Sequence, residues 1–318
     1  MLNNRKKQVN LIIKDQVIRY MVNSQSTIEG MADYGEVFLE DGVIADGKII
    51  DKEVFLEKLH QLVNEKKWKN WPLSFCVPDS SVTIREHLVP KQLKKEEIKS
   101  YINMELQDSI RLPFNDPVID FVITGEEGSQ SKILLFAYPR ERISDFLQLF
   151  GKAGLKPLVA DLSSLCLYRL YFQLGLASDK EHLLLIQWGK DSIVLTAFYQ
   201  KKPVFTRQVK SLLPSANWAY SPEENDLAWQ GNQEEIGQSL EEQMVMAERF
   251  MDFYQYSVMD GEQQITKVLL TGDFPYLNRV EEFMKENYHI PVQLINELED
   301  KIPVPGKYAD VLGLSIKK

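Results

Sequence analysis

The chain has 318 residues, of which 44% are hydrophobic, and this is enough for a large core shared by two or more packed units. Its 37 Lys and Arg residues against 46 Asp and Glu residues give a net charge of −9, which argues against a nucleic-acid-binding surface over most of the molecule. The longest apolar runs are far shorter than the ~20 residues of a membrane-spanning helix. The first ten residues lack the apolar core of a signal peptide, so we expect a soluble intracellular protein.

Few residues are arranged for familiar chemistry. Cys76 and Cys166 each lie in an apolar segment without metal-ligand spacing, which predicts two buried thiols in a reducing compartment. The four histidines lie in separate predicted elements with no i, i+4 pair among them, so a zinc or hydrolase centre is poorly supported. Neither GxxxxGK[ST] nor GxGxxG occurs, which excludes enzymes built on those phosphate-binding motifs.

The first part of the chain has an α/β pattern. Two apolar strands are predicted over residues 9–22, around a turn at Asp15 and Gln16, and a third over 35–39. A helix over 52–65 and a strand over 73–77 follow them. A hairpin followed by a helix and a strand is typical of a mixed-sheet lobe.

Residues 78–155 form a self-contained pattern of strand, helix, strand, strand and helix. The predicted elements are 81–89, 94–108, 118–124, 132–138 and a helix that Pro139 opens. In this last helix, Ile143, Phe146, Leu147 and Phe150 have the spacing of a buried stripe. We expect a compact α+β unit inserted into the larger fold.

The second part of the chain repeats the first in kind. After a strand at 158–161 and a helix at 163–174, the segments LLLIQWG, SIVLTAFY and VFTRQVK predict a second set of hairpin strands. Residues 212–235 are polar and predict an irregular loop, the best candidate for disorder. The remaining predicted elements are a long amphipathic helix at 234–259, a strand at 267–270, a helix at 276–287, a strand at 292–295 and a helix at 308–316.

Three turns occupy places where phosphate could bind. The turns Lys14 to Gln16 and Gln187 to Asp191 are equivalent in the two halves, and Thr271 to Asp273 joins a strand to a helix. Backbone N–H groups can cradle phosphate only where the backbone approaches closely, which favours glycine. The first turn has none and the second only Gly189. For the turn Thr271 to Asp273, a plain strand-to-helix turn with an Asp cap is at least an equal interpretation.

Several segments, in order and spacing, resemble one family from end to end. They are LVP at 88–90, IRLPFNDPVIDFVI at 110–123, GKAGLKPLVADLSSLCLYRL at 151–170, KKPVFTRQV at 201–209, VLLTGDFPYLNRVEEFM at 268–284, HIPVQLI at 289–295 and YADVLGLSI at 308–316. The chain resembles PilM, the type IV pilus assembly protein related to FtsA and actin. The resemblance implies an actin-like (ribonuclease H-like) α/β fold of two lobes, with an inserted α+β subdomain of the FtsA and PilM type.

The same resemblance implies that the chain is divided into four parts. They are a first lobe from 1–77, 156–178 and 305–318, the inserted subdomain 78–155, a second lobe from 179–210 and 265–304, and a small outer subdomain of the second lobe at 211–264.

Members that bind ATP end the first strand with Asp-Ile-Gly and then Ser or Thr, where this chain has Leu11 to Lys14. They carry Asp-Ile-Gly again where this chain has Gln187-Trp188-Gly189. Their Gly-Gly adenosine turn corresponds to Gly272-Asp273. We therefore expect an inactive nucleotide cleft that holds neither ATP nor magnesium or another metal. The alternative is that Asp15 and Asp191 act as substitute metal ligands. The remnants of this cleft are Lys14, Asp15, Gln187, Gly189, Asp191, Thr271 and Gly272.

With ATP hydrolysis set aside, the resemblance implies a binding function. It implies a cytoplasmic scaffold at the inner face of the membrane, whose groove between the first lobe and the insert takes up the N-terminal peptide of the membrane protein PilN, beside other pilus components. Apolar and polar side chains of the insert suit an extended peptide, and we expect Arg85, Tyr101, Arg111 and Phe114 to line the groove. The alternatives are an active ATPase that polymerises, and an FtsA-like filament former, which is disfavoured because no spare amphipathic helix follows Leu314.

Overall fold

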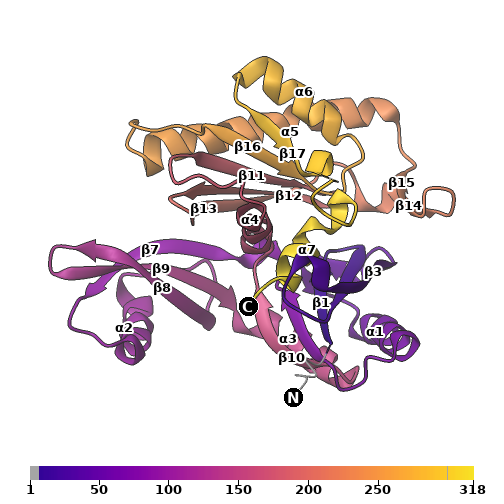
Figure 1. The fold of residues 1–318 in the computed structure, drawn as a ribbon, viewed down its shortest axis with the longest axis horizontal. Coiled ribbons are helices and arrows are strands. Elements are labelled where there is room, and N and C mark those ends of the chain that lie inside the picture. The colour runs from indigo at the N-terminus through magenta and orange to yellow at the C-terminus, as the bar shows by residue number, and fades with distance from the viewer. Residues whose placement is uncertain (1–6, 299) are drawn as a thin grey trace.

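The computed structural model describes residues 7–298 and 300–318, except for the side chains of residues 107 and 108. Two five-stranded sheets lie one above the other with two helices between them, and a smaller three-stranded sheet lies beside the lower one (Figure 1). This is the two-lobe α/β arrangement with an α+β insert that the sequence predicts.

The first lobe is built on the sheet β10-β6-β1-β2-β3. Its strands are β1 (Gln8–Ile13), β2 (Val17–Asn23), β3 (Met31–Phe38), β6 (Pro72–Cys76) and β10 (Lys156–Asp161), with the short pair β4 (Ile44–Ala45) and β5 (Lys48–Ile49) beside them. Helix α1 (Lys52–Lys66) covers one face because Phe55, Leu59 and Leu62 recur on one side of it and are buried. Asp51 caps this helix by accepting hydrogen bonds from two backbone N–H groups of its first turn.

The second lobe repeats this plan in the sheet β13-β12-β11-β16-β17. Its strands are β11 (His182–Trp188), β12 (Ser192–Tyr199), β13 (Lys202–Lys210), β16 (Lys267–Thr271) and β17 (Val292–Leu294). In each lobe three antiparallel strands are followed by two parallel ones in the same spatial order. The internal repeat predicted from the hairpins is therefore confirmed.

Helices α4 (Ser163–Gln173) and α7 (Ala309–Ser315) lie between the two sheets (Figure 1). They share one hydrophobic core with Ile12 and Met21 of the first sheet and Leu183, Leu185 and Leu269 of the second. Burial of a continuous apolar layer between the lobes stabilises their packing.

The contact between α4 and α7 requires a glycine. A Cβ built on Gly313 of α7 would lie 2.0 Å from the backbone oxygen of Cys166 in α4. Arg169 of α4 donates a hydrogen bond to the Gly313 carbonyl at 2.8 Å, so the two helices are held at this distance.

We therefore expect Gly313→Ala to lower the free energy of unfolding by roughly 1–3 kcal/mol, although alanine favours helix formation by up to about 1 kcal/mol. Gly237→Ala in helix α5 (Gln233–Phe253) is the matched control, because a Cβ there has no neighbour within 4 Å. Urea unfolding of both variants measures the difference. A Gly313→Ala protein as stable as Gly237→Ala would show that the two helices can separate without cost.

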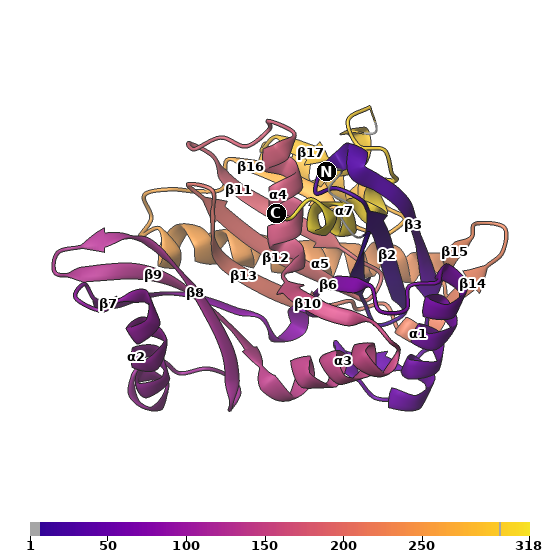
Figure 2. The ribbon, with the colours of Figure 1, turned by 60° about the horizontal axis from the view of Figure 1, so that its bottom comes forward.

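The insert consists of the sheet β7-β9-β8 and one helix. Its elements are β7 (Thr83–Pro90), α2 (Lys95–Asp108), β8 (Pro117–Glu127) and β9 (Gln130–Pro139). Ile98 and Ile102 of α2 pack on Ile133 and Leu135 of the central strand to form a separate small core. The insert projects to one side of the first lobe (Figure 2).

Helix α3 (Arg140–Lys152), expected as the last element of the insert, packs elsewhere. Its Phe146 and Phe150 form an aromatic cluster with Phe55 and Phe75 in the core of the first lobe, with ring centroids 5.0–6.5 Å apart. We propose that the insert ends near Pro139 and that α3 belongs to the first lobe, because a helix belongs to the core that buries its apolar face.

Residues 212–235 differ from the predicted irregular loop. They contain the hairpin β14 (Trp218–Ser221) and β15 (Asp226–Trp229), and the chain then enters α5 (Gln233–Phe253), which continues into a π-helical turn at Tyr254–Val258. Trp218 is buried in the second-lobe core and packs edge-on to Trp229. The prediction was wrong because the packing of the buried Trp218 and the half-buried Trp229 outweighs the polar composition around them.

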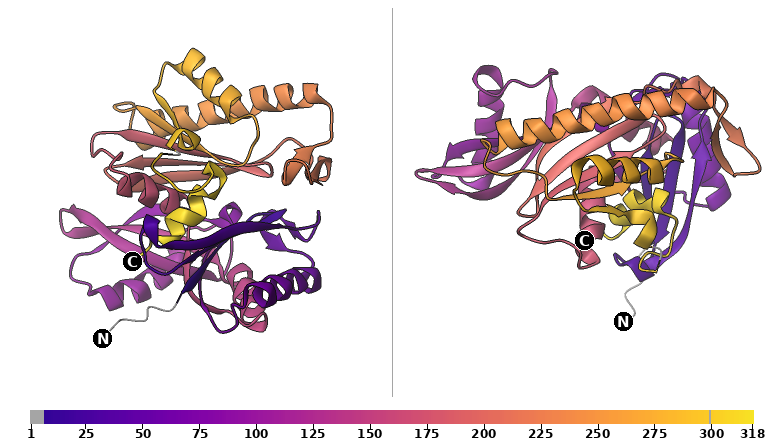
Figure 3. Two further views of the ribbon diagram at one scale, coloured as in Figure 1. Left: turned by 45° about the vertical axis from the view of Figure 1, so that its right-hand side comes forward. Right: turned by 90° about the horizontal axis from the view of Figure 1, so that it is seen from above.

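Helix α5, seen along its length above the second sheet in Figure 3, packs on that sheet through Met244, Ala247 and Phe250. Helix α6 (Leu277–Tyr288) packs on the same core through Val280 and Met284. We propose that α5 forms part of the second-lobe core, to which the β14–β15 hairpin also contributes Trp218 and Leu227. No helix in residues 7–298 or 300–318 has the length and apolar character needed to cross a membrane.

Candidate functional site

The three turns predicted as cleft remnants meet where the two lobes face each other. The backbone N–H of Asp15 donates to Asp191 Oδ2 at 3.3 Å, and Lys14 Nζ lies 3.9 Å from Asp273 Oδ1. Gln187 and Thr271 are buried partners on neighbouring strands β11 and β16. The structure therefore brings residues from both halves of the chain to one place.

Gly272 allows the closest approach in this region. Its φ is +139°, and a Cβ on it would lie 1.9 Å from the backbone oxygen of Trp188. The backbone N–H of Phe274, two residues after Gly272, donates to the same Trp188 oxygen at 3.2 Å. Gly189, which the sequence also singles out, closes the β11–β12 turn by donating its N–H to the Ser192 oxygen at 2.8 Å. Both glycines have structural roles that need no bound phosphate.

A network of charged side chains fills the junction between the lobes. Arg19 of β2 is 1% exposed and contacts Glu36 Oε2 at 3.1 Å and Asp273 Oδ2 at 2.6 Å. Lys307 lies 2.5 Å from Glu36 Oε1 and 3.0 Å from Asp226 Oδ2. Lys190 completes the network with a 2.7 Å contact to Asp226 Oδ1.

Sequence reasoning missed Arg19, although a signal was present. A positive charge inside the apolar strand segment VIRYMV requires a buried partner, because an unpaired buried charge is strongly destabilising. The sequence could not identify that partner, since Asp273 lies 254 residues away in the chain.

The space that remains between the turns is a cavity of about 30 Å³, lined among others by Lys14, Asp15, Asp79, Gln187 and Asp191. Pockets for small molecules usually measure about 300–1,000 Å³, whereas about 10–15 Å³ is enough for one water. This cavity is large enough for water and far smaller than a usual small-molecule pocket. Within the described part of the chain, no group of three or more His, Cys, Asp or Glu side chains is arranged to hold a metal ion.

Two carboxyl groups at this cavity are held with raised pKa values. Burial and the neighbouring Asp191 raise the pKa of Asp15 to about 6, although the N–H groups of Asp46 and Gly47 donate to its carboxylate. Burial also raises the pKa of Asp79 to about 6, against the opposing effect of a 2.7 Å hydrogen bond from Ser163 Oγ. At neutral pH both groups are ionised in a site that disfavours their charge.

These shifts predict that the protein becomes more stable as the pH falls from about 7 to 5. An unfolded carboxyl group has a pKa of about 4, so between about pH 4 and 6 the folded state binds protons that the unfolded state does not. The pKa of Asp226, paired with two lysines, is lowered instead, so its stabilising contribution is lost only at more acidic pH.

We expect the Tm at pH 5.5 to exceed that at pH 7.5 by a few degrees. Asp79→Asn should raise the Tm at pH 7.5 and flatten this dependence, while Asp41→Asn, at an exposed carboxylate, should keep it. Differential scanning calorimetry over this range measures both effects. An unchanged pH profile in Asp79→Asn would contradict the raised pKa of this group.

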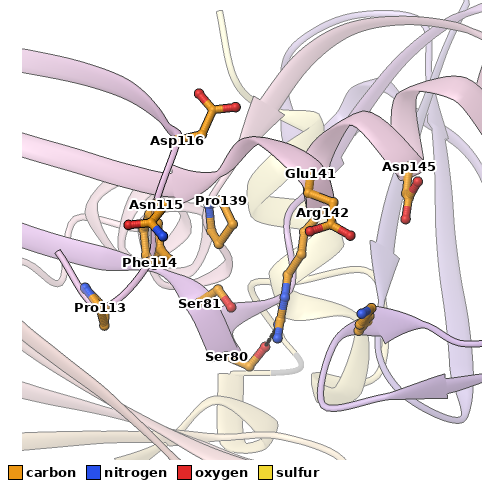
Figure 4. Close-up of a pocket in the computed structure, with 11 residues that line it drawn as sticks. Ser80, Ser81, Pro113, Phe114, Asn115, Asp116, Pro139, Glu141, Arg142 and Asp145 are labelled. Atoms are coloured by element: carbon orange, nitrogen blue, oxygen red, sulfur yellow. Dashed lines mark hydrogen bonds between the residues drawn. The ribbon is translucent and has the colours of Figure 1, made fainter. Parts of the chain in front are cut away.

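The predicted groove residues fall into different places. Phe114 lines a cavity of about 680 Å³ between the first lobe, the insert and α3, together with Ser80, Ser81 and Arg142 (Figure 4). Arg111 and Phe114 line an adjoining hollow of about 540 Å³ against α2. Tyr101 lines a third hollow, with His87 and Glu105, and the exposed Arg85 lines none of these three.

Arg142 was not predicted and holds one wall of the larger cavity in place. Its Nη1 donates to Ser80 Oγ and to the Asp46 carbonyl, both at 3.0 Å, so α3, the segment before β7 and the β4–β5 turn are tied together. The stretch from Pro113 to Asp116 forms the opposite wall. No local motif marks Arg142, because three separate segments form this contact only in the folded chain.

The comparisons with solved structures establish the fold. A chain of a PilM–PilN type IV pilus biogenesis complex is 17% identical, with a TM-score of 0.77 over 98% of both chains. A Bacteroides thetaiotaomicron protein of unknown function with an actin-like ATPase fold is 10% identical, with a TM-score of 0.52 over 100% of both chains. MreB 5 of Spiroplasma citri bound to AMPPNP is 9% identical, with a TM-score of 0.50 over 98% of this chain and 95% of that one. The chain therefore has the actin-like ATPase fold.

The sequence comparisons establish the family. No curated protein matches this sequence significantly. The model of the type IV pilus assembly protein PilM matches residues 18–211, which is more than half of the chain and includes the insert. The protein belongs to the PilM family of type IV pilus assembly proteins.

Proposed function

We propose that this protein is a scaffold of pilus assembly that does not hydrolyse ATP and that binds the N-terminal peptide of a PilN-like membrane protein. The observation that carries the first part is the junction between the lobes, where ion pairs leave a cavity of only about 30 Å³. Catalysis of phosphoryl transfer depends on positioning the nucleotide and its metal ion. Carboxylates line this junction instead, and they would repel a polyphosphate.

The larger cavity beside Phe114 and the hollow next to it are the places that suit a peptide. They meet at Phe114, Asn115 and Asp116, so an extended chain could pass from the first lobe along the insert without interruption. Phe114 and Leu112 offer apolar surface, and both are partly buried against the insert core. Proteins bind extended peptides through hydrogen bonds to the peptide backbone and through pockets that take alternate side chains of the peptide. Such a scaffold would work at the cytoplasmic face of the inner membrane and be held there by its partners.

Calorimetric titration tests both parts of the proposal. The full chain is titrated with the N-terminal cytoplasmic peptide of the PilN-like protein from the same source, and separately with Mg·ATP. We expect saturable binding of the peptide and none of Mg·ATP.

Phe114→Ala should weaken peptide binding by at least about tenfold, because hot-spot aromatic side chains contribute about 2 kcal/mol or more. Phe172→Ala removes an aromatic ring that is 51% exposed on α4 and should leave binding unchanged. Equal affinities of the two variants for the peptide would place the peptide site elsewhere on the molecule.

An active ATPase is the second candidate, and the likeness in fold to an MreB bound to AMPPNP favours it. It requires the lobes to separate far enough for a nucleotide to enter, which breaks the contacts of Arg19 and Lys14 with Asp273. Saturable Mg·ATP binding together with phosphate release above background would establish the active ATPase. The same result would reject the proposal of a scaffold that does not hydrolyse ATP.

A further inference from the structure

The two cysteines of the chain meet in the core between the lobes. Cys76 ends β6 and Cys166 lies in α4, and both are free, buried thiols, 2% and 0% exposed. Their Sγ atoms are 3.5 Å apart, so the two side chains point toward each other. A disulfide bond is about 2.05 Å long, and the two sulfur atoms need to approach by only about 1.5 Å more to form one.

The two sulfur atoms have different surroundings. Arg169 Nη1 donates to Cys166 Sγ at 3.6 Å, and the Asp161 carboxylate and the Gly313 carbonyl hold this guanidinium in place, each at 2.8 Å. A guanidinium beside a sulfur favours the thiolate, which is the nucleophilic form. The Arg169 side chain is 26% exposed, so Cys166 Sγ is one side chain away from solvent. Burial raises the pKa of the Cys76 thiol, and Cys76 therefore stays protonated.

The pair lies at the two ends of the segment that contains the insert. Cys76 is the last residue of β6 before the chain enters the insert, and Cys166 lies in the helix that follows β10. Residues 77–165 therefore form one segment whose ends meet at this pair. Helix α4 also packs with α7 in the core between the lobes. A bond from β6 to α4 would fix the base of the insert to that helical layer.

We propose that Cys76 and Cys166 form a redox pair that a hydroperoxide such as hydrogen peroxide converts into a disulfide, which ties β6 to α4. The Cys166 thiolate attacks one peroxide oxygen and breaks the O–O bond, which yields a sulfenic acid and, once the leaving oxygen is protonated, water or an alcohol. The Cys76 sulfur then attacks the Cys166 sulfur. The S–S bond forms, the S–O bond breaks, and the hydroxyl leaves as water with the Cys76 proton. The two sulfur atoms lose two electrons to the peroxide, and a dithiol reductant reverses the reaction.

The test treats the folded full chain with hydrogen peroxide, blocks the remaining thiols with N-ethylmaleimide in denaturant and measures the intact mass. We expect a monomer that has lost two hydrogen atoms and takes up no label, and peptide mapping should join Cys76 to Cys166. Its Tm should rise by at least a few degrees, because the bond closes a loop of 90 positions in the unfolded chain. Dithiothreitol should restore both labelling sites and the original Tm.

Three variants locate the chemistry. With hydrogen peroxide and dimedone, which labels sulfenic acids, Cys76→Ser should be labelled at Cys166, Cys166→Ser should stay unlabelled, and neither should gain thermal stability. Arg169→Gln should form the disulfide at least about tenfold more slowly than wild type, because Cys166 loses the donor that favours its thiolate. A label on Cys76 in Cys166→Ser, or an equal rate in Arg169→Gln, would contradict the proposed order of events.

Two outcomes with wild type alone would overturn the proposal, whether or not every variant folds. They are the absence of a bond between Cys76 and Cys166 after treatment of the folded chain, and an oxidised protein whose Tm is not raised.

Discussion

Replacing Arg19 with methionine is expected to lower the free energy of unfolding by about 3–5 kcal/mol, the usual cost of leaving a buried charge without its partner. The guanidinium is 1% exposed and lies between Glu36 and Asp273, whose side chains are 6% and 4% exposed. Methionine fills much of the same volume but leaves two buried carboxylates close to each other. Chemical denaturation of wild type and Arg19→Met measures the loss.

Two comparisons separate the loss of charge from the loss of packing. Arg140→Gln removes a surface ion pair with Asp116 and should cost less than about 1 kcal/mol, since exposed pairs contribute little. The triple variant Arg19→Met, Glu36→Gln, Asp273→Asn removes the carboxylates as well and should regain most of the stability that Arg19→Met loses. A triple variant no more stable than Arg19→Met would show that Arg19 acts by packing alone.

Phe146→Ala is expected to lower the free energy of unfolding by about 3–5 kcal/mol, as large-to-small changes of buried aromatic side chains do. The ring is 1% exposed and packs on Phe55 at 6.0 Å and on Phe75 at 6.5 Å between centroids, so its loss leaves a cavity in the first lobe. Leu147→Ala, at the next position and 39% exposed, is the matched control and should cost far less.

The same pair of variants tests whether α3 belongs to the first lobe. Hydrogen exchange in Phe146→Ala should accelerate in β6 and α1, which bury this ring, more than in β8 and α2 of the insert. Faster exchange confined to the insert would place α3 with the insert, as the sequence led us to expect.

Much of the fold follows from local patterns. The spacing of Phe55, Leu59 and Leu62 predicts α1, and the two sets of apolar hairpin strands predict a duplicated lobe, because periodicity alone determines which face of an element is buried. The hairpin at 218–229 was missed because two tryptophans gave no periodic pattern, and their burial depends on a core formed by distant strands.

The candidate sites divide in the same way. Sequence reasoning placed Lys14, Asp15, Asp191 and Gly272 at turns, and these turns do meet between the lobes. It also grouped Arg85, Tyr101, Arg111 and Phe114, of which the structure brings only the last two to one hollow. These residues come from a strand, a helix and a loop, and after folding they do not all line the same hollow.

The sequence by itself determined the order of most elements, the internal duplication and the family, since these depend on local periodicity and on motifs read along the chain. Only the tertiary structure decided that α3 packs in the first lobe and that Arg19 and Asp273 meet between the lobes. Both contacts join segments that are distant in the chain, and Arg19 lies 254 positions from Asp273. The burial that makes such contacts strong exists only once the chain has folded around them.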